Sequence, residues 1–393
     1  MDFNTIRELD EKYHMAAYKR FNVDIVSGKG SIGVDSTGKE YVDFGSGIGV
    51  NCLGYADEGW VNAVSKQAAT LQHISNLYYS PVQTQLAEKL CKKSGFSKVF
   101  FCNSGAEANE CAIKIARKYS YDKYGSGRNE IITLVNSFHG RTVTTLAATG
   151  QDEFHKYFFP FTEGFSHVFA QDISELENAI NDRTCAVMME LVQGEGGVIP
   201  LDIDYVKQVS EICKKSNLLL IFDEVQTGVG RTGKLYAWEN YEVKPDIITS
   251  AKGLGGGLPF GACMCNEKVG DVLSFGTHGT TYGGNPIACA GSNYVLDCVA
   301  NESFLSSVVE KGEYIKSRLL KMDKVSSVRG MGLMIGADVD GNIRDIVSKC
   351  IENGLLLLSA KNALRMLPPL NITYEEIDRG LDILNKVLSE EKV

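Results

Sequence analysis

The 393-residue sequence lacks the features that mark several protein classes. Basic residues are outnumbered by acidic ones, 40 against 49, and the net charge of −9 argues against a nucleic-acid-binding surface. No apolar run approaches the roughly 20 residues of a membrane span, and the first 20 residues have no apolar core of a signal peptide. We therefore expect a cytoplasmic globular protein whose partners are small molecules or copies of itself.

Paired cysteines and clustered histidines are also missing. The 11 cysteines are an odd number without C-x-x-C pairs, and Cys263 and Cys265 lie two apart with no histidine nearby. The 6 histidines show no spacing typical of metal ligands. We expect buried, reduced thiols and no metal site.

From about residue 98 the sequence alternates short apolar runs with longer amphipathic segments. This alternation is typical of a wound α/β sheet. Strands are expected at Lys98–Cys102, Glu130–Leu134, Ala186–Leu191, Leu218–Asp223, Asp246–Ser250 and Gly261–Cys265. Helices are expected at Ala106–Tyr119 and Asp204–Ser216.

The two ends of the chain have a different pattern. Residues Ile32–Asp43 predict a hairpin around a Ser-Thr-Gly-Lys turn, and long amphipathic helices follow residue 290, with a short strand at Gly332–Ala337 and a closing helix at Tyr374–Ser389. Neither end has enough apolar surface to fold alone. We therefore expect a large domain at 46–288 and a smaller α+β domain built from 1–45 and 289–393.

Three groups that can do chemistry follow elements of the large domain. Asp223 ends one apolar strand, Lys252 follows another, and Ser104–Ala106 joins a strand to a helix start suited to an anion. Taken alone, a lysine at a strand end is more often a solvated charge, and Ser104 is equally suited to capping a helix. Together, at one edge of a sheet, the lysine, the acid and the helix start fit pyridoxal 5'-phosphate.

The segment 223-DEVQTGVGRTGKL-235 offers a competing interpretation, because it matches two nucleotide-binding patterns. Residues 228–233 give G-x-G-x-x-G, and residues 228–235 give a P-loop pattern apart from its last position. A dinucleotide fingerprint should open a full crossover helix, but too few residues follow. A P-loop needs Ser or Thr at 235, where this chain has Leu. The glycines therefore predict a turn.

Six motifs occur in one order over nearly the whole chain. They are 104-SGAEANE-110, 137-SFHGRT-142, 193-QGEGG-197, 223-DEVQTGVGRTGKL-235, 246-DIITSAKGLGGGLP-259 and 279-GTTYGGNP-286. In this the sequence resembles the class III pyridoxal-phosphate-dependent aminotransferases. The resemblance implies a fold type I transferase with a mixed, mostly parallel sheet in the large domain. It also implies a homodimer with active sites at the subunit interface.

The resemblance assigns roles to matching residues around the cofactor. Lys252 would be the Schiff-base lysine, and Asp223 would partner the pyridinium nitrogen. Phe138 would stack on the ring, and Gln226 would contact its 3'-hydroxyl. Phe138 read without the resemblance is equally a core residue.

Further residues are assigned to the phosphate and the substrate. Ser104, Gly105 and Ala106 would hold the phosphate, and Thr281 would reach the phosphate of the neighbouring subunit's cofactor. Thr280 would lie beside the substrate. Both threonines could also be ordinary loop hydroxyls.

Two arginines are the expected carboxylate ligands, because a guanidinium binds a carboxylate bidentately. By resemblance, Arg365 takes the α-carboxylate of glutamate or 2-oxoglutarate, and Arg141 takes the distant carboxylate. Glu195 would pair with Arg365 when the ω-amino substrate is bound. The chain departs from the family pattern at Leu191, where Pro is usual, and at 55-YADEGW-60.

Within the class, 41-YVDFGSGIGVNCLG-54 and 76-NLYYSPVQTQLAEKL-90 are most similar to members that act on N2-acetyl-L-ornithine. The expected reaction moves its terminal amino group to 2-oxoglutarate, in arginine biosynthesis. Ornithine, 4-aminobutyrate, succinylornithine and N-succinyl-diaminopimelate intermediates are alternative donors. A nucleotide-dependent dehydrogenase or NTPase, and a non-catalytic pyridoxal-phosphate sensor, are rivals of other classes.

Overall fold

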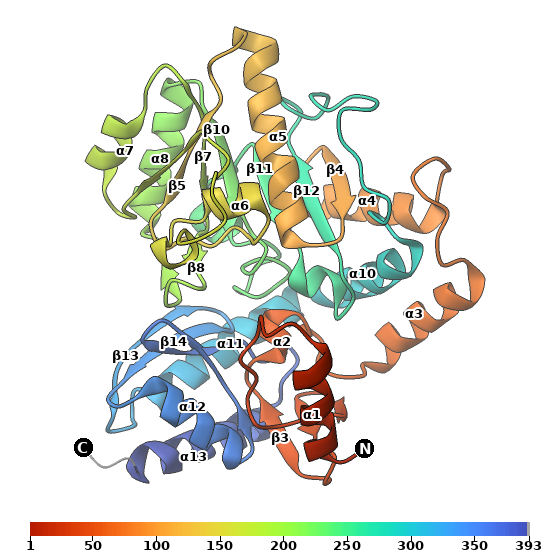
Figure 1. Ribbon diagram of the computed structural model, residues 1–393, viewed down its shortest axis with the longest axis vertical. Coiled ribbons are helices and arrows are strands. Elements are labelled where there is room, and N and C mark those ends of the chain that lie inside the picture. Colours follow the sequence, from red (N-terminus) through yellow and green to blue (C-terminus); the bar gives the residue numbers. More distant parts are fainter. Residues whose placement is uncertain (391–393) are drawn as a thin grey trace.

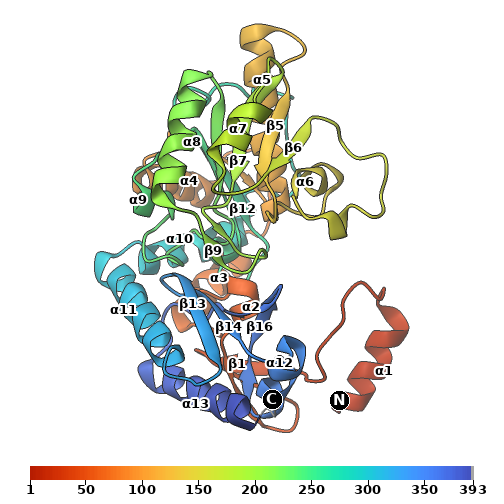
Figure 2. The ribbon, with the colours of Figure 1, turned by 90° about the vertical axis from the view of Figure 1, so that its left-hand side faces the viewer.

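The structure, a computed structural model that describes residues 1–390, forms two lobes, one above the other in Figure 1. The upper lobe holds a seven-stranded sheet between helices, and the lower lobe holds two four-stranded sheets. Both ends of the described chain lie in the lower lobe. Helix α1 (Phe3–Tyr13) stands apart from the body of this lobe in Figure 2, and none of its residues is buried.

The upper sheet has the strand order β4-β12-β11-β10-β7-β5-β6. Strand β12 is antiparallel to both neighbours and the other pairs are parallel, so the predicted mixed, mostly parallel sheet is confirmed. All six predicted strands are present within two residues of their expected bounds, and the edge strand β6 was not predicted. The bounds are β4 (Lys98–Cys102), β5 (Glu130–Leu134), β6 (Phe165–Val168), β7 (Thr184–Met189), β10 (Leu219–Asp223), β11 (Ile247–Ser250) and β12 (Gly261–Cys265).

Helices pack on this sheet through apolar stripes. The two predicted helices are confirmed as α5 (Gly105–Tyr124), which runs five residues further than expected, and α8 (Ile203–Lys215). Both begin at a side-chain cap, Ser104 in α5 and Asp202 in α8, whose oxygens accept first-turn N–H groups. The other helices of this lobe are α3 (Glu58–Thr70), α4 (Pro81–Ser94), α6 (Val143–Ala148), α7 (Ile173–Ala179), α9 (Trp238–Tyr241) and α10 (Pro286–Val299).

The lower lobe joins segments from both ends of the chain. The predicted hairpin is confirmed as β2 (Ile32–Val34) and β3 (Glu40–Asp43), and β3 pairs in parallel with β15 (Leu355–Leu356). The predicted strand at Gly332–Ala337 is found two residues later, as β14. The remaining elements are β1 (Ser27–Lys29), β13 (Val325–Met331), β14 (Met334–Val339), β16 (Leu358–Ala360), β17 (Ala363–Met366), α11 (Glu302–Leu319), α12 (Ile343–Glu352) and the predicted closing helix α13 (Tyr374–Glu390).

The remaining elements are short. They are α2 (Ser46–Gly49), β8 (Val192–Gln193), β9 (Ile199–Pro200) and the 3₁₀ turns η1 (Asp152–Phe154) and η2 (Lys252–Gly255). Helix α10 crosses the predicted domain boundary between residues 288 and 289 and packs mainly on α3 and α4. The division into 46–288 against 1–45 and 289–393 stays a prediction.

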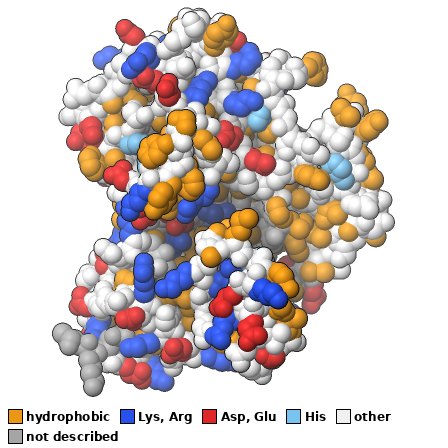
Figure 3. Space-filling view, in the orientation of Figure 1, with side chains coloured by type: hydrophobic (Ala, Val, Ile, Leu, Met, Phe, Trp, Pro, Cys, Tyr) orange, Lys and Arg blue, Asp and Glu red, His pale blue; other side chains and the backbone are white. Residues whose placement is uncertain are grey.

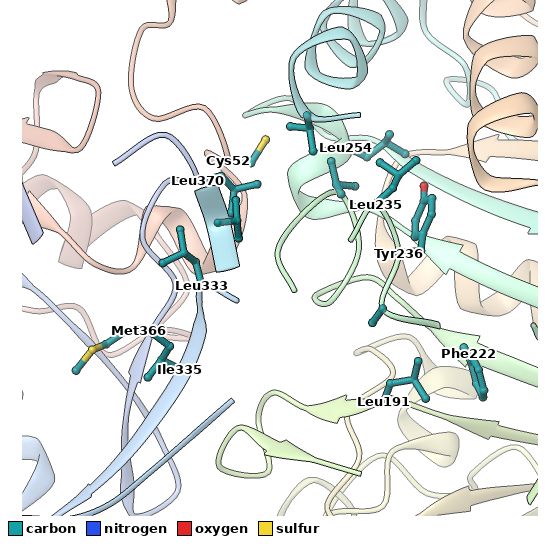
Figure 4. Close-up of a cluster of buried hydrophobic side chains, with 14 of the residues drawn as sticks. Cys52, Leu191, Phe222, Leu235, Tyr236, Leu254, Leu333, Ile335, Met366 and Leu370 are labelled. Atoms are coloured by element: carbon teal, nitrogen blue, oxygen red, sulfur yellow. The ribbon is translucent and has the colours of Figure 1, made fainter. Parts of the chain in front are cut away.

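One apolar core runs through both lobes (Figure 4). Leu191 and Phe222 are its members in the upper lobe, at the right of Figure 4, and Leu333, Ile335 and Met366 are its members in the lower lobe, at the left. All 11 cysteines are free, and nine of them are buried. Among residues 1–390 no group of three or more His, Cys, Asp or Glu side chains is placed to hold a metal ion. No helix of the described chain is long and apolar enough to cross a membrane.

Candidate active site

The ends of three upper-sheet strands deliver the predicted chemical groups to one cavity. Residues directly after β4, at the end of β10 and shortly after β11 line a space of about 490 Å³. Figure 3 shows a hollow between the lobes with Lys and Arg side chains on its walls. Eight of the twelve predicted site residues line the cavity: Ser104, Gly105, Ala106, Phe138, Arg141, Asp223, Gln226 and Lys252.

Asp223 is held in the cavity floor by donors from three other segments. Its Oδ2 accepts from Asn109 Nδ2 at 2.7 Å and lies 2.8 Å from His139 Nδ1. Its Oδ1 accepts from the Val225 N–H at 3.0 Å and from Thr249 Oγ1 at 3.4 Å. The carboxylate is 4% exposed, so these contacts offset much of its desolvation.

Sequence reasoning missed Asn109 and His139, although both stand inside quoted motifs. Asn109 lies on the buried face of α5, and its Nδ2 also donates to the His139 carbonyl at 2.7 Å. The His139 side chain is buried, and its Nε2 has no hydrogen-bond partner among the described residues. A polar residue on an apolar helix stripe was the available signal for Asn109.

Lys252 begins η2 with a backbone conformation that few side chains adopt. Its φ is 45°, in the left-handed region, and strain of this kind occurs mainly where surrounding structure fixes a functional residue. Burial lowers the pKa of Lys252, the Glu195 carboxylate opposes that shift, and the Arg365 charge adds to it. A lower pKa leaves a larger share of the amine neutral at neutral pH, as a base or nucleophile requires.

The N-terminus of α5 borders the same cavity as Asp223. Ser104 caps the helix, and its Oγ accepts from the Glu107 N–H at 3.2 Å. The first N–H groups of a helix have no partner within it, so those of Gly105 and Ala106 can bind an anion. A side chain at Gly105 would come within 2.6 Å of Val225 Cγ1, so only glycine allows the helix start to approach that close to the strand end.

Phe138 and Arg141 form a second wall. The Phe138 ring packs edge-on against Phe154, with centroids 6.1 Å apart. The Arg141 guanidinium lies 4.0 Å from the Phe154 centroid and 5.5 Å from that of Phe138. The exposed Arg141 is thus held by two rings and still open to a carboxylate.

Glu195 and Arg365 form an ion pair just outside the cavity lining. Arg365 Nη1 lies 2.5 Å from Glu195 Oε1, and the arginine is 4% exposed, which excludes an ordinary surface charge. Burial by itself would raise the pKa of Glu195, but the neighbouring Arg365 charge and hydrogen bond lower it. Gln226 also bonds to Glu195, and its Oε1 is buried without a partner among the described residues.

Thr280 and Thr281 lie outside the cavity lining in this chain. Thr280 is half-buried, and its Oγ1 accepts from Asn103 Nδ2 at 3.0 Å. Thr281 is exposed. The predicted contact of Thr281 with a neighbouring subunit's cofactor stays a prediction.

The glycines of residues 228–233 form a packed turn. A Cβ at Gly230 would lie 2.5 Å from Val299 on α10, and one at Gly233 would lie 2.3 Å from Val309 on α11. Only the four-residue α9 follows. The turn therefore has neither space for a phosphate nor the long helix of a dinucleotide site.

The residues present fit pyridoxal phosphate. Its aldehyde requires an amine, which Lys252 provides, and its basic ring nitrogen requires an acid, which Asp223 provides. Its phosphate suits the free N–H groups at the start of α5. The unpartnered Oε1 of Gln226 is an acceptor for the ring hydroxyl.

The aminotransferase class-III family matches residues 13–388. The chain belongs to this family. It is 50% identical to the acetylornithine aminotransferase of Haemophilus ducreyi over 99% of this chain and 100% of that protein. It is similar in structure to the N-acetylornithine aminotransferase of Stenotrophomonas maltophilia K279a, with a TM-score of 0.85, 36% identity and coverage of 97% and 98%.

A third relative carries the cofactor. This is the ornithine aminotransferase of Toxoplasma gondii, crystallised in the presence of oxidized glutathione, with a TM-score of 0.93, 34% identity and coverage of 98% of this chain and 94% of that one. Its active site is described as partly occupied by pyridoxal phosphate. The predicted family and fold are confirmed.

Proposed function

We propose that this chain is an acetylornithine aminotransferase that moves the terminal amino group of N2-acetyl-L-ornithine to 2-oxoglutarate. The products are N-acetyl-L-glutamate 5-semialdehyde and L-glutamate, a step of arginine biosynthesis in the cytoplasm. The observation that carries the proposal is the buried Arg365–Glu195 pair, whose Glu195 acts on the charge of Lys252. The acetylornithine aminotransferase relatives, up to 50% identical in sequence, support the same donor.

The ion pair gives one site two charge states. Arg365 is always charged, and Glu195 compensates that charge when the substrate presents no carboxylate there. A dicarboxylate substrate displaces Glu195 and binds the guanidinium bidentately. Arg141, at the other wall, then takes the second carboxylate of the dicarboxylate or the carboxylate of N2-acetylornithine.

Pyridoxal phosphate, when bound, withdraws electrons from the carbon that carries the amino group. Lys252 would take the proton that leaves this carbon and return it to the cofactor carbon on the far side of the amino nitrogen, and its lowered pKa favours the neutral amine that this transfer requires. Asp223, fixed by Asn109 and His139, would keep a proton on the basic ring nitrogen. Phe138 lies where its ring can limit movement in the cavity.

We further propose that the protein works as a homodimer with shared sites. Large apolar side chains are exposed on two segments, one next to Asn76, which bonds to Thr280 and Gly283, and one around Thr281: Leu77, Tyr78, Tyr79, Phe275 and Tyr282. Tyr79 is 100% exposed, which is unfavourable unless another surface covers it. Mixing Lys252→Ala chains with Thr281→Asp chains tests whether each site uses residues of both subunits. If Lys252 of one subunit and Thr281 of the other serve the same site, one of the two sites in a mixed dimer has both native residues, and activity returns. If both residues serve the site of their own subunit, every site in the mixed dimer is damaged and the mixture stays inactive.

A spectrum and a donor panel test the function. The purified protein should show a visible cofactor band that disappears in Lys252→Ala, and N2-acetylornithine should convert the wild-type band. A band that no ω-amine converts would indicate a sensor, and the absence of a band would exclude a pyridoxal-phosphate enzyme.

The donor panel compares kcat/KM for several ω-amino donors, and the value should be highest for N2-acetylornithine. A higher value for ornithine, which the ornithine aminotransferase neighbours favour, or for 4-aminobutyrate or succinylornithine would replace the proposed donor.

A further inference from the structure

Glu190 is a buried acid of the cavity that has no part in the chemistry above. It follows β7 directly, is 5% exposed, and lines the cavity together with Asp223 and Lys252. A buried carboxyl is costly unless its oxygens are bonded. Its contacts therefore indicate what the residue does.

The two oxygens of Glu190 bond to two different walls of the site. Oε2 accepts from the Phe138 N–H at 2.9 Å, and Oε1 accepts from the Gly194 N–H in a longer contact of 3.4 Å. Phe138 belongs to the segment that follows β5, and Gly194 to the turn that follows β8. No other side chain among the described residues is hydrogen-bonded to both of these backbone groups.

The Gly194 peptide continues this connection to the ion pair. Its carbonyl accepts from Arg365 Nη1 at 3.4 Å, and the next residue is Glu195, which binds the same nitrogen. A Cβ at position 194 would lie 2.3 Å from Gln226 Oε1, so the turn is closely packed on its other side. A shift of the Gly194 peptide therefore changes the geometry of the ion pair.

We propose that Glu190 is a positioning residue that couples the Phe138 wall to the Arg365–Glu195 pair. It acts through the Phe138 and Gly194 backbone N–H groups that its oxygens accept from. Through its two acceptor oxygens it fixes the ring that lies over the cofactor and the guanidinium that binds the dicarboxylate. This inference rests on the proposed function, because it assigns Arg365 to 2-oxoglutarate.

Protonation of Glu190 should loosen this coupling. Burial raises the pKa of Glu190 to about 7, with His139 lowering it and Asp223 raising it. Lys252, Arg141 and the Arg365–Glu195 pair are the other charged groups at the site. Below this pH the carboxyl is protonated and one oxygen no longer accepts freely, so binding of 2-oxoglutarate should weaken as the pH falls through 7.

The test compares Glu190→Gln with Glu224→Gln. Glu224 is the matched control, because it is fully buried, its pKa is also raised to about 7, and it bonds to Thr227, Ala237 and Trp238 away from the cavity. Glu190→Gln should raise the KM for 2-oxoglutarate about tenfold, with a smaller change in kcat, and reduce the visible circular dichroism of the cofactor-loaded protein. Glu224→Gln should lower the Tm without either effect.

The pH dependence of the KM supplies a second measurement. The wild-type KM for 2-oxoglutarate should rise as the pH falls through 7, and that of Glu190→Gln should not. A wild-type KM without this inflection, or a Glu190→Gln protein that behaves like Glu224→Gln, would overturn the coupling. Failure of the proposed function is distinguishable, because the wild-type protein itself would then fail to convert N2-acetylornithine with 2-oxoglutarate.

Discussion

At the residue scale, the site contains two cations that respond differently to burial. An amine can lose its proton, and burial lowers the pKa of Lys252. A guanidinium keeps its charge in proteins, so the buried Arg365 needs an acid, and Glu195 provides it at 2.5 Å. Burial therefore favours the neutral amine at Lys252 and requires a counter-charge at Arg365.

Lys252→Arg tests the first of these roles. Arginine keeps a positive charge and cannot act as the neutral base, so kcat should fall by about 10² to 10⁴. The fold should be preserved. An unchanged far-ultraviolet circular dichroism spectrum would check this, because that signal reports the sheet and the helices. A variant with more than a tenth of wild-type kcat would show that another group moves the proton.

Glu195→Gln tests the second role. The variant leaves the Arg365 guanidinium buried without a counter-charge. The Nε of Arg365 already has no hydrogen-bond partner among the described residues. The free protein should therefore lose about 3 to 5 kcal/mol of stability. Added 2-oxoglutarate should raise the Tm of the variant more than that of the wild type, because its carboxylate replaces the missing one. Equal shifts of the calorimetric Tm in the variant and the wild type would contradict the role of Glu195 in compensating the Arg365 charge.

At the element scale, the turn at residues 228–233 connects the end of the upper sheet to two helices. Gly230 and Gly233 both have a φ of 84° and pack against α10 and α11. The resemblance of this segment to a phosphate loop therefore arises from close packing. Positive φ and lack of space produce the same glycine spacing as a nucleotide site.

Gly233→Ala measures the backbone strain at positive φ together with the clash of the added Cβ. Gly276→Ala measures the backbone strain alone. Gly276 has a φ of 78° with no atom within 4 Å of an added Cβ, so its replacement costs only backbone strain, about 1 to 2 kcal/mol. At Gly233 a clash with Val309 adds to the strain, so the total should be about 3 kcal/mol or more. Denaturant unfolding of both variants gives the difference, and equal losses would exclude the packing explanation.

At the scale of the whole molecule, Arg231 ties the lobes together. It lies within the glycine turn of the upper lobe, and its buried Nη1 donates to the carbonyls of Leu333 at 2.9 Å and Pro368 at 2.6 Å in the lower lobe. The shared apolar core surrounds this contact. The lobes should therefore unfold as one unit.

Arg231→Met should separate them. The methionine leaves two buried carbonyls without a donor, at a cost of about 1 to 3 kcal/mol each. The calorimetric transition should move to lower temperature and broaden or split. Arg379→Met is the control, because its pair with Glu40 is half exposed and should contribute less than about 1 kcal/mol. A single sharp transition at the wild-type Tm in Arg231→Met would show that the apolar core alone joins the lobes.

The sequence predicted most of the upper lobe and the order of its motifs. Buried parallel strands have continuous apolar runs, as in β10, so their positions follow from composition. Strand β6 was missed because its central Ser166 and His167 interrupt the apolar pattern.

The predicted site residues were found by motif, and those that support them were not. His139, Glu190 and Arg231 each make a contact with a residue 52 to 137 positions away, which local patterns do not report. Arg365 was assigned only by resemblance, because its burial depends on the pairing of β17 with β14. The sequence indicates which groups are available, and the fold decides which of them meet.

The pairing of β3 with β15 bears on how the chain is made. All strands of the upper sheet have been synthesised when Cys265 leaves the ribosome, whereas the hairpin of β2 and β3 receives its parallel neighbour only at Leu355. During translation the β3 edge of the hairpin therefore stays unpaired while about 300 further residues are synthesised. A strand edge that stays exposed can pair with other chains and aggregate. Slower translation of the segment between β12 and β15 should therefore reduce the yield of soluble protein.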